Sequence, residues 1–222
     1  MRARLVVGAD GAGSTVRRLA YPHEPAPERY SAVQAVYDAG ASDPFYGAIF
    51  DESLTDFYGW TIPKGGTIAV GAAFPAGGGV PERFDALVAK LRESGFRFGR
   101  ELSRSSAQIS RPTRPGHLFV GRGRVLLTGE AAGFISPSSA EGISYALRSG
   151  AELAGALEGG LEGATSRYVS AAWPLALNVA MKAVKGSAIY GAGMRRLIMR
   201  SGIGALPPSG SRAHGVDLGW LR

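Results

Sequence analysis

The stretch that most constrains the fold of this 222-residue chain runs from position 124 to position 157, RVLLTGEAAGFISPSSAEGISYALRSGAELAGAL. The short apolar run Val125–Thr128 predicts a buried strand, and the small residues of Gly129–Gly133 predict a tight turn. A long helix should begin between Pro137 and Ile143 and end near Leu157. α/β proteins hold nucleotide-like ligands with a carboxylate at the carboxyl end of a strand and the N-terminus of the helix that follows.

The composition excludes several kinds of site. The absence of cysteine rules out disulfides, thiolate zinc sites, iron–sulfur clusters and cysteine nucleophiles. The three histidines, His23, His117 and His214, have no metal-like spacing, so we expect no metal site. The net charge of +7 is concentrated in residues 161–222, which hold eight Lys/Arg and two Asp/Glu. We expect no nucleic-acid partner, and no apolar run reaches the roughly 18 residues of a membrane span.

The first residues predict a strand, a turn and the start of a helix. Arg4–Gly8 has the composition of a buried strand, Ala9–Ser14 is a turn, and Thr15–Leu19 begins a helix. Two glycines in the turn suggest a dinucleotide-binding G-x-G-x-x-G, but position 16 is Val16, and no acidic residue ends a second strand about 20 residues later. We therefore interpret this segment as an ordinary strand–turn–helix.

The middle of the chain predicts an inserted module of sheet and helix. Apolar positions at helical spacing predict an amphipathic helix over Pro81–Gly95. The turn-bounded strands around it suggest an antiparallel sheet. The α/β structure into which this module is inserted resumes at Gly116–Val120. The predicted strands are 31–37, 45–50, 55–62, 67–74 and 102–110.

The end of the chain is predicted to be helical and then loose. Residues 165–173 and 175–185 are expected to form two helical stretches, with Pro174 as a kink or boundary. Residues 192–200 form a short basic helix, and 201–222 are rich in Gly, Pro and Ser.

Three segments resemble motifs of one flavoprotein superfamily. Leu5–Arg17, LVVGADGAGSTVR, resembles the Asp-Gly motif of FAD-dependent monooxygenases and their relatives. Arg124–Ile143 resembles their Gly-Asp motif. Tyr58–Pro63, YGWTIP, with Val70 and Gly71 downstream, is similar to the Tyr-x-Trp-x-Phe-Pro signature of the geranylgeranyl reductase branch. The resemblance covers about residues 4 to 160.

The resemblance implies an α/β fold with three parts. Residues 1–20 and 115–160 would form part of a three-layer FAD-binding domain. Residues 21–114 would form an inserted antiparallel-sheet substrate domain, and 161–222 the C-terminal helices and loose tail. In the family a Gly-rich ADP-binding motif lies far upstream of the Asp-Gly motif. This chain starts at the Asp-Gly motif, so we expect it to be the C-terminal portion of a flavoprotein.

The resemblance also implies cofactor contacts. At the position of Glu130 the family usually has Asp, whose carboxylate accepts a hydrogen bond from the ribityl chain or lies beside the pyrophosphate. Residues 136–142 would place amide groups and the positive end of a helix near the flavin pyrimidine ring, which favours anionic reduced flavin by about 1 kcal/mol. The residues expected to bind FAD are Asp10, Gly11, Gly129, Glu130, Ala131, Gly133, Gly142 and Ile143.

Each of these assignments has a simpler alternative. Glu130 could be a solvated turn residue, although a charged side chain in a small, apolar turn is rarely buried without a partner. Asp10 could cap the local backbone, because Asp-Gly is a common turn pair. Arg17 could pair with a phosphate or lie exposed on its helix.

The resemblance assigns Tyr58, Trp60 and Pro63 to the wall of an apolar substrate cavity. Strand alternation puts Tyr58, Trp60 and Ile62 on one face, which also suits ordinary packing in a sheet core. No catalytic residue is identified, and the proton donor could be Tyr58 or water.

The implied activity is hydride transfer from N5 of reduced FAD to a double bond of a prenyl lipid of the geranylgeranyl type. NAD(P)H or another reductant would supply the electrons. The alternatives are an FAD-dependent aromatic monooxygenase, or a truncated or degenerate flavoprotein with no activity alone. We expect a cytoplasmic protein, whose basic helix 192–200 either contacts an anionic membrane or presents a solvated basic face.

Overall fold

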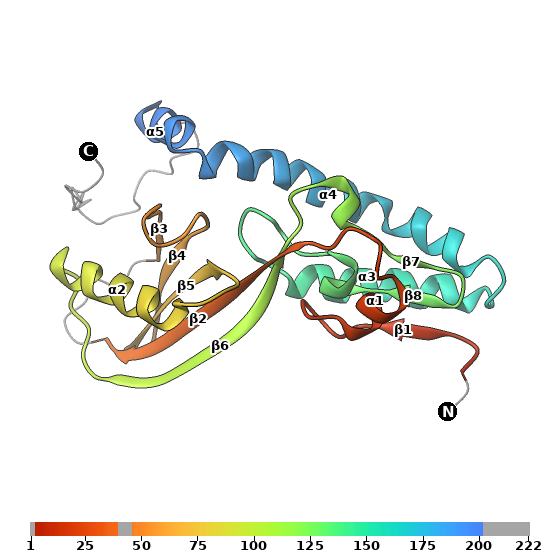
Figure 1. Cartoon of the computed structure of the whole chain (residues 1–222), viewed down its shortest axis with the longest axis horizontal. Coiled ribbons are helices and arrows are strands. Elements are labelled where there is room, and N and C mark those ends of the chain that lie inside the picture. The colour runs from red at the N-terminus through yellow and green to blue at the C-terminus, as the bar shows by residue number, and fades with distance from the viewer. Residues whose placement is uncertain (1–2, 40–45, 202–222) are drawn as a thin grey trace. The chain divides into compact units, whose positions relative to one another are not determined.

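A computed structural model describes residues 3–39 and 46–201 of the chain (Figure 1). The chain divides into two compact units. The first contains the residues up to 32 together with 107–189, and the second contains 33–106 and the residues from 190 onward. Two of the unit boundaries fall inside the long strands β2 (Glu28–Asp38) and β6 (Glu101–Arg111), each of which contributes residues to both units, and the third falls after residue 189.

The first unit contains a three-stranded sheet in the order β1-β8-β7. Strands β1 (Val6–Gly8) and β8 (Val125–Leu127) run parallel, and β7 (Gly121–Arg122) is antiparallel to β8. Gly8 is required where helix α1 (Thr15–Ala20) crosses the sheet. A Cβ there would lie 2.7 Å from Leu127 Cδ2 and 2.8 Å from Val16 Cβ, closer than carbon atoms can approach.

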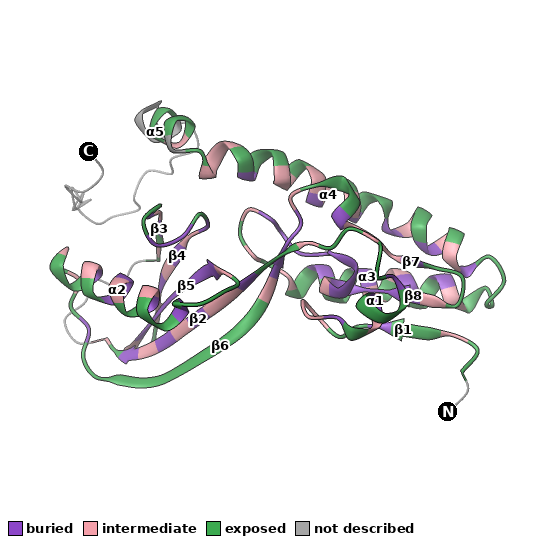
Figure 2. Cartoon of the chain, in the orientation of Figure 1, coloured by how far each residue is buried: buried purple, intermediate pink, exposed green. Residues whose placement is uncertain are grey.

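Two helices pack on this sheet and close the core of the first unit. Helix α3 (Ile143–Glu158) starts within the predicted window, and α4 (Ala164–Tyr190) follows it. The hydroxyl of Tyr168, on α4, is fully buried and donates to Leu127 O at 3.1 Å, so a polar group in the core is satisfied. Figure 2 shows buried residues in purple. The buried cluster of this unit includes Leu126, Leu127, Phe134, Tyr145, Leu153, Tyr168, Leu175 and Val179.

The predicted boundary at Pro174 is wrong, because α4 runs without interruption from residue 164 to residue 190. Proline removes the hydrogen bond to the carbonyl of residue 170. Both Pro174 and Ser170 are exposed, so water can hydrate that carbonyl. The buried neighbours Ala172 and Leu175 hold the helix against the core on either side of the proline.

The second unit contains the predicted antiparallel module of sheet and helix. Its strands form a sheet in the order β3-β4-β5-β2-β6. Helix α2 (Val80–Glu93) supplies the apolar positions Phe84, Leu87, Val88 and Leu91 to a buried cluster with the sheet. The remaining strands are β3 (Gly47–Ile49), β4 (Gly59–Lys64) and β5 (Thr67–Pro75), and the predicted strand 45–50 is described only from residue 46.

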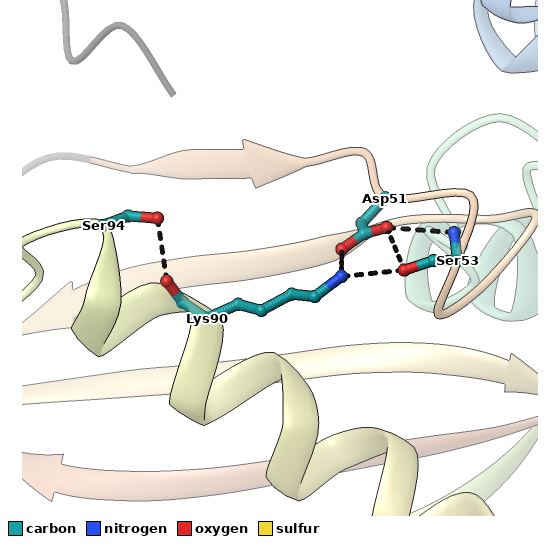
Figure 3. A network of polar contacts seen from close by, with 4 residues as sticks. All are labelled: Asp51, Ser53, Lys90 and Ser94. Carbon is teal, nitrogen blue, oxygen red and sulfur yellow. Dashed lines mark hydrogen bonds and ion pairs between the residues drawn. The ribbon is translucent and has the colours of Figure 1, made fainter. Parts of the chain in front are cut away.

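A polar network ties the loop after β3 to α2, as Figure 3 shows. Lys90 Nζ donates to Asp51 Oδ2 at 2.6 Å and to Ser53 Oγ at 2.8 Å, and Ser53 N and Oγ both donate to Asp51 Oδ1. Asp51 is only 8% exposed. Burial alone would raise the pKa of Asp51, but the hydrogen bonds from Lys90 and Ser53 outweigh it and hold the pKa below its usual value.

The predicted basic helix is α5 (Ala192–Ser201). Its Arg195 donates to Glu52 Oε1 at 2.8 Å, and the guanidinium carbon lies 5.2 Å from the centroid of the Phe50 ring. This arginine is therefore held inside the second unit. The predicted loose tail, 202–222, lies outside the described residues. Among the described residues, none of the helices combines the length and the hydropathy that crossing a bilayer requires.

Candidate functional site

The two motif loops of the first unit start side by side at the carboxyl ends of β1 and β8. The register pairs Val6 with Val125 and Gly8 with Leu127, and Thr128 N then donates to Gly8 O at 2.9 Å. Open α/β sheets bind ligands at this edge. The structure thus brings together the loop containing Asp10 and Gly11 and the turn Gly129–Gly133, which are 118 positions or more apart in the sequence.

A cavity of about 190 Å³ lies beside these loops. Its wall combines α1, the proline-rich linker that follows it, the end of β6 and the turn after β8. Cavities that enclose drug-sized ligands measure about 300–1,000 Å³, so this one has room for only part of a dinucleotide. The charged side chains in the wall are Arg17, Arg18, Glu24, Arg29 and Glu130.

Glu130 is half-buried in the wall of this cavity. Its Oε1 accepts a hydrogen bond from Ser110 N at 2.5 Å. Burial raises the pKa of the Glu130 carboxyl, and the Ser110 bond opposes the shift only in part. Glu130 is therefore not a freely solvated turn residue, and its contact with a cofactor remains a prediction.

Asp10 uses its carboxylate to cap α1. Oδ1 accepts from Ser14 Oγ at 2.6 Å, and Oδ2 accepts from Thr15 N at 2.7 Å and Val16 N at 3.1 Å. Partial burial raises the pKa of Asp10, but these hydrogen bonds together lower it below the usual value. The local capping interpretation thus describes the contacts of Asp10. A cofactor role for this residue and for Gly11 remains a prediction.

Arg17 is buried, with 6% of its surface exposed, which neither sequence interpretation anticipated. Its guanidinium donates to the carbonyl oxygens of Ala131 at 3.0 Å, His117 at 3.1 Å and Pro25 at 2.5 Å. Burial lowers the pKa of Arg17, and the nearby Glu24 opposes that shift. Arg17 therefore joins α1 to the linker and to the turn that carries Glu130. The spacing of the motif contains no signal for this role.

Contacts within the protein itself explain the small residues of the turn after β8. Gly133 has φ +88°, and a Cβ there would lie 2.6 Å from His117 O. Ala131 and Ala132 are buried, and Gly129 has φ +57°. Glycine is therefore required at 133 whether or not a ligand approaches.

The start of α3 is less positive than the resemblance implies. Gly142 precedes the helix and offers no side-chain cap, and Ile143 is 79% exposed. Glu141 Oε1, however, accepts from Ser144 N at 3.0 Å. A carboxylate at this position offsets part of the positive potential of the helix end. Nearby, Ala140 has φ +53°, an uncommon conformation for a residue other than glycine.

The predicted substrate residues belong to the second unit. Tyr58, Trp60 and Ile62 are half-buried, whereas the alternate residues Gly59 and Thr61 are buried, as strand alternation predicts. The three half-buried side chains are not part of the cluster that packs against α2. They define the aromatic face of the sheet.

Contacts within the aromatic face hold its rings in place. The Tyr58 and Trp60 ring centroids are 5.7 Å apart, and Trp60 Nε1 donates to Gln34 Oε1 at 3.0 Å. Gly71 lies against the indole, because a Cβ there would be 2.4 Å from it. Burial, with a smaller contribution from Tyr46, raises the pKa of Tyr58 to about 12. Pro63, the third predicted substrate residue, is half-buried and pairs with Ile68.

Among the described residues, His, Asp and Glu side chains nowhere gather in a group of three that could hold a metal ion.

The chain is similar to curated proteins named CbrA. It is 39% identical over 205 residues to CbrA of Shigella dysenteriae, a match that covers 92% of this chain and 57% of that protein. CbrA of Escherichia coli O9:H4 is also 39% identical over 205 residues, with 56% of that protein covered. The chain thus spans little more than half the length of these relatives. No protein-family model matches it.

Solved structures with this fold include flavoproteins. A geranylgeranyl bacteriochlorophyll reductase-like protein from Thermoplasma acidophilum has a TM-score of 0.68 at 18% identity, over 87% of this chain and 51% of that one. PqsL of Pseudomonas aeruginosa, a probable FAD-dependent monooxygenase, has a TM-score of 0.58 at 20% identity, over 90% and 59%. An HpxO variant of Klebsiella pneumoniae, complexed with FAD, has a TM-score of 0.57 at 17% identity, over 89% and 56%. The α/β fold predicted from the resemblance is confirmed.

Proposed function

We propose that this chain is the flavin-contacting and substrate-contacting part of an FAD-dependent oxidoreductase. The observation that supports this most is the convergence of the two motif loops at the carboxyl ends of β1 and β8. The fold shared with flavoproteins, one of which was solved with FAD, supports the same reading.

The residues present suit part of an FAD molecule. Glu130 offers a half-buried carboxylate in the cavity wall. A Cβ added at Gly11, which has φ +74°, would meet no atom within 4 Å, so a ligand can approach this backbone closely. In our proposal, Glu130 accepts a hydrogen bond from the ribityl chain, and Gly11, Gly129 and the first turn of α3 lie against the cofactor. When bound, FAD supplies the two-electron chemistry of its isoalloxazine ring.

The aromatic face of the second unit would contact the substrate. Tyr58 and Trp60 offer apolar rings that exclude water from a prenyl chain. Burial raises the pKa of Tyr58 further above neutrality, so its phenol stays protonated at neutral pH, as that of an ordinary tyrosine does, and can donate a hydrogen bond. We propose reduction of a prenyl double bond, of the geranylgeranyl type, with NAD(P)H or another reductant as the electron donor.

Hydroxylation of an aromatic substrate is the second candidate. The similarity in fold to PqsL, a probable FAD-dependent monooxygenase, favours it. Flat aromatic substrates also stack on tyrosine and tryptophan rings, so the aromatic face suits either substrate class.

The two activities can be separated by experiment. The purified chain is mixed with FAD, reduced without oxygen, and then given geranylgeranyl diphosphate. Reoxidation of the flavin by the lipid without oxygen supports the reductase. Formation of a hydroxylated product when oxygen and an aromatic substrate are added supports the hydroxylase, because oxygen alone also reoxidises reduced flavin. A folded chain that binds no FAD at any concentration tested contradicts both.

A further inference from the structure

Helix α4 is apolar on two faces, and only one of them is buried. Tyr168, Ala172, Leu175 and Val179 face the core of the first unit. At about 100° per residue, the exposed apolar residues fall within roughly one third of the circumference, along about 22 Å of helix. They are Val169, Trp173, Leu177, Met181 and Val184, with exposed fractions of 48%, 64%, 47%, 56% and 75%. We call these five residues the α4 stripe.

An exposed apolar stripe of this length is expected to bind another surface. Helices that are apolar all round are normally buried, and a contiguous exposed apolar patch marks a site of interaction. Exposed apolar residues elsewhere in the described part of the first unit, such as Leu19 on α1, do not form a row of this length. The α4 stripe is therefore a candidate docking surface.

The charges around the stripe indicate what covers it. Within the first unit, residues 164–189 of α4 contain three cations, Arg167, Lys182 and Lys185, and no Asp or Glu. Lys185 is exposed next to the end of the stripe, about 100° around the helix from Val184. Lys182 is half-buried, with its Nζ 5.0 Å from the centroid of the Tyr145 ring. A helix that carries an exposed apolar stripe, an exposed lysine beside it and no carboxylate of its own suits a partner that is apolar and anionic.

We infer that the α4 stripe rests on an anionic lipid surface. Amphipathic helices with large apolar residues on one side and Lys/Arg beside them lie in the plane of such a membrane. Trp173, the second residue of the stripe, is a residue type that favours the boundary between lipid and water. This contact is a surface contact and not a span. It is independent of the proposed function, and it involves α4 instead of the helix 192–200, whose Arg195 is bound to Glu52.

The same charges argue against a second copy of the chain as the cover. A two-fold axis would place the α4 stripe of one chain against that of its partner. The cations of both α4 helices would then meet with no carboxylate in 164–189 to compensate them. Like charges facing each other across an interface are unfavourable, whereas anionic headgroups neutralise them.

Sedimentation with lipid vesicles tests this inference on the full chain. Vesicles of phosphatidylcholine containing phosphatidylglycerol should bind the chain, and vesicles of phosphatidylcholine alone should bind it several-fold more weakly. The double variant Trp173→Gln, Leu177→Gln should lose roughly tenfold or more in affinity for the anionic vesicles. Lys185→Glu should lose roughly fivefold to tenfold, and high salt should weaken binding of the unmodified chain.

Leu19→Gln is the matched control, since Leu19 is 75% exposed and lies on α1 instead of α4. It should leave vesicle binding unchanged, and all variants should unfold at the temperature of the unmodified chain because the altered side chains are exposed. Absence of binding to anionic vesicles at low salt would overturn the inference. So would an equal loss in Leu19→Gln, or a lipid-free dimer that the double variant dissociates.

Discussion

The two groups of predicted site residues are held in place by different means. In the first unit, the motif loops are fixed by buried contacts of the backbone: Arg17 holds three carbonyl groups, and Gly133 fits against His117 O. In the second unit, Tyr58 and Trp60 stand on the half-buried face of a regular sheet. Changes in the first group should therefore affect stability strongly, and changes in the second should affect mainly ligand contacts.

The strongest test of this comparison is Arg17→Leu. The variant leaves the carbonyls of Pro25, His117 and Ala131 without this donor in a buried place. We expect a loss of about 3–5 kcal/mol in the free energy of unfolding. Urea denaturation followed by circular dichroism measures it. A loss within experimental error would mean that Arg17 does not hold the loops.

Gly133→Ala and Gly11→Ala form a matched pair. Both glycines have positive φ, so each change carries the cost of a left-handed alanine, about 1–2 kcal/mol. At Gly133 the new Cβ also meets His117 O, whereas at Gly11 it meets nothing within 4 Å. We expect Gly133→Ala to cost about 2–4 kcal/mol in total. Equal costs in thermal unfolding would contradict the close approach at Gly133.

Asp51 should make the stability of the second unit depend on pH. Its pKa is lower in the folded chain than in the unfolded chain, so it stabilises the fold above the unfolded value of about 4. That stabilisation is lost as the pH falls through the lower folded value. Asp51→Asn should lower the free energy of unfolding by only about 1 kcal/mol at neutral pH, because Lys90 is partly exposed to solvent. The loss should be smaller in acid, where Asp51 is itself protonated. Denaturation at several pH values checks this, and a constant difference would refute it.

Trp60→Phe should have only a small effect on stability, comparable with that of Asp51→Asn. It removes the hydrogen bond to Gln34 and part of the contact with Gly71, at the half-buried aromatic face. We expect a loss of about 0.5–1.5 kcal/mol in the free energy of unfolding. A loss as large as that of Arg17→Leu would show that the aromatic face is ordinary core. It would contradict the expectation that changes in the second unit affect stability less than changes in the first.

Local patterns predicted the elements better than the contacts of the site. The alternation of residues 58–62 indicated the aromatic face, and helical spacing indicated α2, because both depend on nearest neighbours in the sequence. The bond from Ser110 N to Glu130 and those from Arg17 to His117 and Ala131 join residues 20 to 114 positions apart. No local periodicity encodes such pairs.

Proline and the start of α3 show a further limit of sequence analysis. Pro174 is predicted as a kink or a boundary; the boundary is wrong, because the packing of Ala172 and Leu175 and the exposure of Ser170 allow α4 to continue. The resemblance implied a positive helix end near residue 142, yet Glu141 lies at that end and offsets part of its potential. In the first case tertiary packing outweighs the local rule, and in the second a side chain three residues away in the sequence does.

The central claim is that Glu130 and the loops around it contact FAD, and titration of the chain with FAD tests it most directly. Flavin fluorescence gives the Kd for the unmodified chain, Glu130→Gln and Glu130→Ala, with the exposed Glu82→Ala as the control. We predict that Glu130→Ala raises the Kd by roughly tenfold to a hundredfold, while Glu130→Gln, which keeps an acceptor, raises it less. An unchanged Kd in a folded Glu130→Ala variant would contradict the account.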